Sequence, residues 1–86
     1  LIADDVNWIA IPALTAPLRC KAKTRYRQQE ERATVTPLAD GKIQVTFDEP
    51  QRAMTVGQAV VLYDGDTVLG GGTILSVPDE EQGETL

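Results

Sequence analysis

The sequence has 86 residues, enough for one small domain and too few to surround a deep catalytic cleft. Histidine is absent and Cys20 is the single cysteine, which removes the commonest general base, any intramolecular disulfide and any cysteine-based zinc site. The net charge of −5 argues against a nucleic-acid partner for the chain taken as a whole.

The charges are nevertheless unevenly distributed. Six of the eight basic residues lie between Arg19 and Arg32, where only Glu30 and Glu31 oppose them, so this segment carries +4 and the rest of the chain −9. Such asymmetry predicts a local anion-binding surface on an otherwise acidic body.

Features of targeting and compartment point to the cytoplasm. No apolar run approaches the roughly 20 residues of a membrane helix, and the first residues lack the basic region of a signal peptide. A lone cysteine fits a reducing compartment, so we expect a cytoplasmic protein without membrane contact. Because the chain begins with Leu1 rather than Met, we expect a fragment of something longer.

The first half of the chain predicts short β-strands separated by turns. Three of them are expected at residues 6–11, 18–27 and 32–38. Asp40-Gly41 predicts a hairpin turn, because a type I′ turn needs positive φ at both central residues. Residues 42–47 then alternate, with Ile43, Val45 and Phe47 directed to one face.

The second half continues the same pattern. Residues 51–55 are expected to be a short strand or an extended segment, and residues 58–63 an apolar strand buried on both faces. Asp64-Gly65-Asp66 predicts a second hairpin, followed by a strand at residues 67–75. The run Gly70-Gly71-Gly72 inside that strand marks a bulge or a tight corner where a neighbouring backbone comes close.

About six antiparallel strands in so short a chain need closure to avoid exposed edges. We therefore predict an all-β fold, a small closed antiparallel barrel over residues 1–77. Residues 78–86 are acidic and poor in apolar side chains, and we expect them to form a disordered tail.

The clearest functional pattern is the strand at residues 18–27. Basic residues occupy every second position and share one face: Arg19, Lys21, Lys23, Arg25 and Arg27. The intervening residues Cys20, Ala22, Thr24 and Tyr26 face a core. Two interpretations stay open for the basic face: pairing with acids of the protein in solvent, or contact with a phosphate backbone. Tyr26 is likewise either a core aromatic or a residue that stacks on an unpaired base.

No other constellation predicts chemistry in this chain. The carboxylates lie beside Gly or Pro in turns, which explains them without an acid pair. The glycine run is followed by neither a lysine nor a helix and is not a phosphate loop. Cys20 has no histidine partner. We predict no catalytic residue, no metal site and no cofactor.

Three stretches resemble the end of the tRNA-specific 2-thiouridylases, the MnmA or TrmU family. The stretches are RCKAKTRYRQ at residues 19–28, FDEPQRA at residues 47–53 leading to GQAVV at residues 57–61, and YDGD at residues 63–66 with LGGG at residues 69–72. VNWI at residues 6–9 also fits. The resemblance spans residues 6–74 in order and at matching spacing.

This resemblance implies a C-terminal β-barrel, similar to the second domain of translation elongation factors, in a three-domain enzyme. Such an enzyme makes 2-thiouridine at the anticodon wobble position of tRNA, using ATP with magnesium and persulfide sulfur from a relay donor. The family's catalytic cysteines and nucleotide-binding loop belong to the upstream domains and are not matched here. The implied partners of this domain are the tRNA anticodon arm and those upstream domains.

The resemblance also implies which residues contact tRNA. Arg25, Tyr26 and Gln58 match contacting positions of the family, although Val56 stands where the family usually has proline. Four further basic residues are expected to act through phosphates: Arg19, Lys21, Lys23 and Arg27. The alternative is a structural brace that packs on the upstream domains with little RNA contact. A standalone hydrolase is disfavoured by the missing histidine and the short chain.

Overall fold

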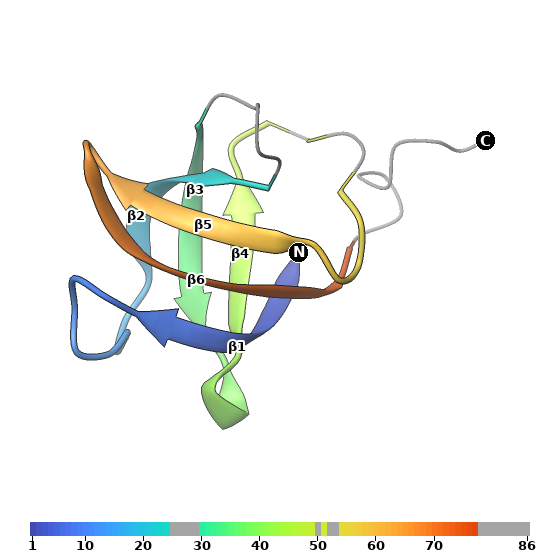
Figure 1. Ribbon diagram of the computed structural model, residues 1–86, viewed down its shortest axis with the longest axis horizontal. Helices are drawn as coiled ribbons and strands as arrows, with labels where there is room; N and C mark the ends of the chain where they lie inside the picture. Colours follow the sequence, from blue (N-terminus) through green and yellow to red (C-terminus); the bar gives the residue numbers. More distant parts are fainter. Residues whose placement is uncertain (25–29, 50, 52–53, 78–86) are drawn as a thin grey trace.

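The computed structural model of the chain describes residues 1–24, 30–49, 51 and 54–77. Its elements are β1 (Ile2–Trp8), β2 (Leu18–Lys23), β3 (Glu31–Pro37), the 3₁₀ turn η1 (Ala39–Gly41), β4 (Ile43–Phe47), β5 (Ala59–Asp64) and β6 (Thr67–Ser76). The six strands close into one barrel in the order β1-β4-β3-β2-β5-β6, with every neighbouring pair antiparallel (Figure 1). The predicted all-β closed barrel is confirmed.

Both predicted hairpin turns are present. Asp40 and Gly41 have φ of 62° and 75°, and the Lys42 amide donates to the Ala39 carbonyl at 3.3 Å. In the second turn the ladder closes on Asp64 and Thr67, so the central residues are Gly65 and Asp66 rather than Asp64 and Gly65. Only Gly65 of this pair has positive φ, at 61°. Glycine adopts this conformation without steric cost.

The core is made by the inward side chains of the strands, by Leu1 before β1 and by the loop residue Met54. Its buried members are Leu1, Ala3, Ala22, Ala33, Val35, Ile43, Val45, Phe47, Met54, Val60, Leu62, Leu69 and Ile74. The predicted alternation in β4 is confirmed, because Ile43, Val45 and Phe47 are buried while the residues between them are exposed. In a barrel wall only one face of each strand can be buried.

That geometry corrects the prediction for β5. Val60 and Leu62 are fully buried, but Ala59 is exposed and Val61 and Tyr63 are only partly buried. The strand is therefore not buried on both faces, and its apolar outer residues form part of the molecular surface.

The first strand also differs from its prediction. It spans Ile2–Trp8 rather than residues 6–11, because the chain pairs with β6 through an irregularity between Asp4 and Asn7. Asp5 lies inside this irregularity with φ of 50°. After Trp8 the chain leaves the ladder, and the amides of Ile9 and Ala10 both donate to the Leu69 carbonyl. A prediction from alternating apolar and polar residues cannot detect such an irregularity, because the extra residues interrupt the alternation.

Two other predicted segments lie only in part within the described residues. β2 ends at Lys23, and residues 25–27 of the predicted long strand lie outside the described residues. In the segment 51–55, the described residues Gln51, Met54 and Thr55 belong to no strand. Met54 instead buries its side chain in the core. The predicted tail at 78–86 also lies outside the part of the chain that the structure describes.

The glycine run confirms the expected close approach of backbones. A Cβ on Gly71 would lie 2.5 Å from the Val60 carbonyl oxygen, and one on Gly70 would collide with the Asn7 carbonyl oxygen. These positions therefore accept no side chain without a shift of β1 or β5. Among the residues described here, no helix has the length and apolarity to cross a membrane.

Candidate nucleic-acid interface

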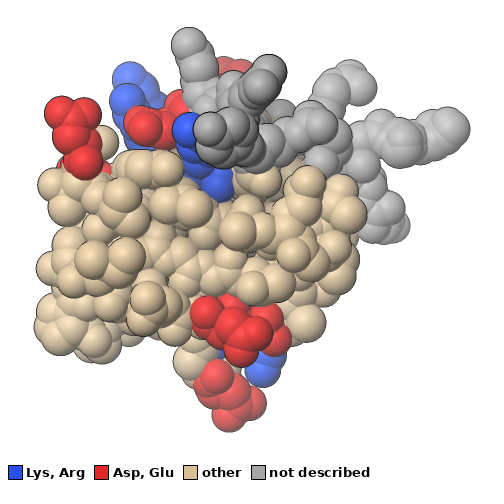
Figure 2. Space-filling model, in the orientation of Figure 1, with Lys and Arg blue, Asp and Glu red and all other residues tan. Residues whose placement is uncertain are grey.

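The basic residues of β2 lie on the outer wall of the barrel. They are exposed or partly exposed: Arg19, Lys21 and Lys23. At the alternate positions Ala22 and Thr24 are buried, and Cys20 packs half-buried against the core. The predicted alternation is confirmed over residues 19–24. Figure 2 shows most of the basic side chains of the visible face gathered at one end of the barrel, with acidic side chains beside them.

Arg19 is already engaged within the protein. Its guanidinium donates to both carboxylate oxygens of Asp48, at 2.6 and 2.7 Å, and to Thr34 Oγ1 at 2.9 Å. The hydrogen bond from Arg19 lowers the pKa of Asp48, and the same bond raises the pKa of Arg19. For this residue the structure shows pairing with an acid of the protein, the first of the two interpretations of the basic face.

Lys21 has a different environment. Its strand partner in β3 is Arg32, so two cations stand directly opposite each other on the outer face. Like charges in this position repel and destabilise the sheet. Within the described residues neither of them forms an ion pair. They line a shallow hollow of about 320 Å³ together with Glu30, Glu31, Asp48 and Glu49.

On its other side Lys21 is paired with Tyr63 of β5. The row across the barrel wall is therefore Tyr63, Lys21, Arg32 and then Asp48, whose amide donates to the Arg32 carbonyl at 3.0 Å. The sequence predicted Arg32 as part of the basic segment at residues 19–32 but not its place opposite Lys21, and it did not predict Tyr63 as a member of this surface. Arg32 and Tyr63 are 11 and 42 positions from Lys21 in the chain, and only the strand register brings them together.

Gln58 precedes β5 and is partly built into a turn. Its side-chain oxygen accepts a hydrogen bond from the backbone amide of Thr55 at 3.2 Å, and the backbone amide of Gln58 donates to the Thr55 carbonyl at 3.1 Å. Since Lys23 pairs with Val61, Gln58 lies near the end of the barrel where β2 finishes. The side-chain amide group keeps its donors for another partner. Three of the other predicted contact residues lie outside the described residues: Arg25, Tyr26 and Arg27.

Metal-binding side chains are not grouped in the described part of the chain. No group of three or more Cys, Asp or Glu side chains there could hold a metal ion. Burial raises the pKa of the Cys20 thiol, which disfavours the reactive thiolate.

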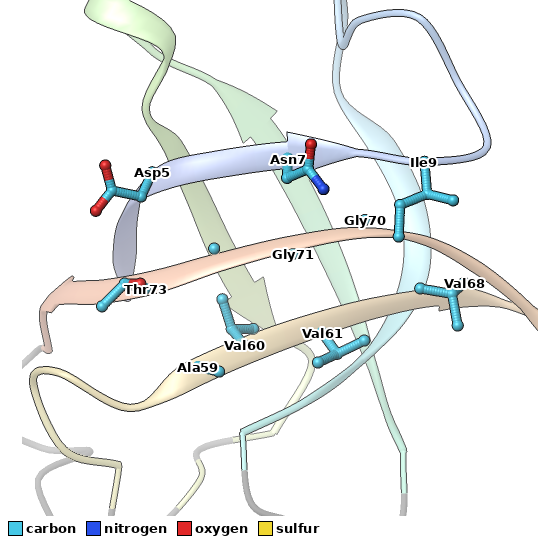
Figure 3. A pocket seen from close by; sticks show the side chains of 11 residues that line it. Asp5, Asn7, Ile9, Ala59, Val60, Val61, Val68, Gly70, Gly71 and Thr73 are labelled. Atoms are coloured by element: carbon cyan, nitrogen blue, oxygen red, sulfur yellow. The ribbon is translucent and has the colours of Figure 1, made fainter.

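A second surface feature is a shallow groove of about 350 Å³ over β1, β5 and β6 (Figure 3). Its floor is the glycine run, and its sides are largely apolar residues, among them Ile9, Val61 and Val68. Asp5 is its one ionisable lining residue. A polyanion is not attracted to such a surface. The candidate nucleic-acid interface is therefore the outer face of β2 and β3, here called the cationic wall, with the basic residues Arg19, Lys21, Lys23 and Arg32.

Comparison with known proteins gives the family. The family described as the aminomethyltransferase beta-barrel domain matches residues 1–74. A tRNA-specific 2-thiouridylase MnmA of Symbiobacterium thermophilum is 60% identical over 74 residues, which are 86% of this chain and 19% of that protein. The MnmA of Geobacillus thermodenitrificans is also 60% identical, over 86% of this chain and 20% of that protein. The MnmA of Marinomonas sp. is 55% identical, over 86% of this chain and 19% of that protein.

The chain thus spans about a fifth of the length of these curated relatives. The matched region holds all six strands up to Ile74 of β6, so it includes both the cationic wall and the glycine run. The chain belongs to the aminomethyltransferase beta-barrel domain family and corresponds to the C-terminal domain of the tRNA-specific 2-thiouridylases.

Proposed function

We propose that this barrel binds tRNA for a larger 2-thiouridylase, holding the anticodon arm against the cationic wall of β2 and β3. The observation that carries the proposal is the outward row of basic side chains on β2 in a chain whose net charge is −5. An outward row of basic side chains attracts a polyanion locally, and the acidic remainder of the body repels it. The names of the relatives, tRNA-specific 2-thiouridylases, supply the class of RNA.

In this proposal the reaction belongs to the remaining four-fifths of the enzyme. That enzyme converts the wobble uridine of tRNA to 2-thiouridine in the cytoplasm, with ATP and magnesium activating the base and a persulfide donor supplying sulfur. The barrel contributes no catalytic residue. Its role is to position the RNA, which lowers the entropic cost of bringing the base to the reacting groups.

The contacts divide according to what each side chain has available. Lys21 and Lys23 act through phosphates, because their side chains are solvent-facing and mobile point charges. Gln58 donates from its side-chain amide while its oxygen stays on Thr55. Arg25, Tyr26 and Arg27 remain predicted contacts. Arg19 is assigned to Asp48 instead of to phosphate in the free domain.

The test is RNA binding by the 86-residue chain. Fluorescence anisotropy with a labelled anticodon stem-loop is expected to detect binding that weakens linearly in log[salt]. The double variant Lys21→Glu/Lys23→Glu should weaken it by about tenfold or more. Lys42→Glu is the control for the single variant Lys21→Glu, which changes the net charge by the same amount, because Lys42 follows the η1 turn at the other end of β3. Equal losses from these two single variants would show only a net-charge effect and would overturn the proposed surface.

A second candidate function is the structural brace. The bidentate Arg19–Asp48 pair favours it, since one cation of the row already serves the protein itself. The apolar groove over β1, β5 and β6 also supplies a surface suited to protein contact. A brace predicts no measurable RNA affinity for the chain and no effect of the Lys21→Glu/Lys23→Glu change, which the same titration decides.

A further inference from the structure

Tyr63 lies on the outer wall beside the two opposed cations. Its strand partner is Lys21, whose partner on the other side is Arg32. Directly paired residues of neighbouring strands point to the same face, with Cβ atoms about 5 Å apart. The three side chains therefore form one row on the barrel surface, and Tyr63 is only partly buried in it.

The electrostatics of this row depend on Arg19. Asp48 closes the row at its far end, but its carboxylate is already occupied by the Arg19 guanidinium. Lys21 and Arg32 are consequently left as a like-charged pair, with Glu30, Glu31 and Glu49 as the other acids around their hollow. The side of Lys21 that faces Tyr63 carries no acid in the row. A phosphate bound by Lys21 and Arg32 therefore meets no acid of the row on the Tyr63 side.

We propose that Tyr63 stacks on an unpaired base of the bound RNA while Lys21 and Arg32 bind the adjoining phosphates. The inference rests on the proposed function and adds to it a stacking residue and a phosphate-binding partner for Lys21. An aromatic ring on a sheet surface flanked by cations is how proteins hold single-stranded nucleotides, since every base has a face to stack and the phosphate follows it. The bases of a duplex are already stacked on each other and offer no face to such a ring.

A phosphate also resolves the repulsion between the two cations. Lys21 and Arg32 repel each other across the strands, although acids line the hollow beside them. An anion that bridges them replaces repulsion with two charge-assisted hydrogen bonds. Relief of the repulsion adds to the affinity for RNA, and binding is expected to raise the thermal stability of the barrel by the amount that this affinity fixes.

The experiment uses the 86-residue chain and two RNA probes, an anticodon stem-loop and a fully paired RNA duplex of equal length. Tyr63→Leu should lower affinity for the stem-loop by about five- to 150-fold, the effect expected for one stacked base. The same change should leave duplex binding unaltered, and Tyr63→Phe should retain stem-loop affinity. Lys21→Ala and Arg32→Ala should each reduce the salt slope by about one.

A measurement on the unaltered chain covers the case in which Tyr63→Leu fails to fold. Nuclear Overhauser contacts between the Tyr63 ring protons and protons of a loop base are expected in the complex. Stem-loop binding with no such contacts, or undiminished in a folded Tyr63→Leu variant, would overturn this inference. If the Lys21→Glu/Lys23→Glu change still weakened binding, the proposed function would stand without it. Absence of binding by the unaltered chain would instead overturn the proposed function itself.

Discussion

The guanidinium of Arg19 reaches from β2 across β3 to the carboxylate of Asp48, just past the end of β4. Both carboxylate oxygens accept, at 2.6 and 2.7 Å, and Thr34 of β3 accepts a third hydrogen bond on the way. This ion pair joins three strands on the outside of the barrel. Arg19 is therefore bound to an acid of the protein itself, whereas Lys21 and Lys23 of the same row are exposed or partly exposed to solvent.

Replacing Asp48 with Asn should strengthen RNA binding. The change removes a negative charge from the end of the row and releases Arg19 to bind a phosphate. The salt slope of binding should then steepen by about one. Anisotropy titrations at several salt concentrations measure this slope.

Asp40→Asn is the control for that change. It alters the net charge equally, but Asp40 lies in the η1 turn away from Asp48, and Asn tolerates its φ of 62°. If Asp40→Asn steepened the salt slope as much as Asp48→Asn does, Arg19 would have no specific part in the effect.

The Arg19–Asp48 pair should also give stability a defined pH dependence. Hydrogen bonding to Arg19 holds the pKa of Asp48 below its ordinary value, about 3.9 in an unfolded chain. The contribution of this carboxylate is therefore complete above about pH 5 and is lost as pH falls through the lowered pKa. The effect is small, since the two side chains are 58% and 42% exposed.

The measurement is the urea midpoint of the unaltered chain and of Asp48→Asn from pH 6 to pH 2. The unaltered chain should have the higher midpoint at pH 6, and the difference should vanish toward pH 2. A difference that stayed constant over this range would mean that the carboxylate charge contributes nothing to folding.

Gln58 offers a clean separation of binding from stability. Gln58→Glu keeps an oxygen that can accept from the Thr55 amide, but it removes the side-chain donor and adds a negative charge. RNA affinity should fall by about tenfold, as for one lost hydrogen bond at an interface, with little change in the melting temperature. Gln58→Ala should lower both. Unchanged affinity in both variants would remove Gln58 from the interface.

Gly71→Ala tests the close packing of β6 against β5. A Cβ at this position would lie 2.5 Å from the Val60 carbonyl oxygen, so the strands must separate. We expect a loss of about 1–3 kcal/mol or more in the free energy of unfolding. Gly41→Ala should cost less, about 1 kcal/mol, because its φ of 75° is strained for alanine but the surrounding space is open. The reverse order in chemical denaturation would contradict the packing described here.

The fold was largely predictable from the sequence because its signals are local. The clean alternation of Ile43, Val45 and Phe47 and the turn at Asp40 and Gly41 are read within a few residues. β1 was misplaced because the irregularity between Asp4 and Asn7, which keeps this segment in the sheet, depends on pairing with β6. The apolar outer face of β5 likewise follows from barrel closure and not from its composition.

The candidate site was predictable only along one strand. The period of two identified the outward cations of β2, and this was correct for Arg19, Lys21 and Lys23. The register between strands that are distant in sequence determines which acid pairs with Arg19 and which residues flank Lys21. Asp48, Arg32 and Tyr63 could therefore not be assigned before the structure.

The most direct test of RNA docking is amide NMR of the chain during titration with a tRNA anticodon stem-loop, at low and at moderate salt. We expect chemical-shift changes concentrated on residues 19–23 and 30–32, at Tyr63 and near Gln58, all weakening as salt rises. A well-dispersed spectrum that does not change, or changes confined to the groove over β1 and β6, would contradict this expectation.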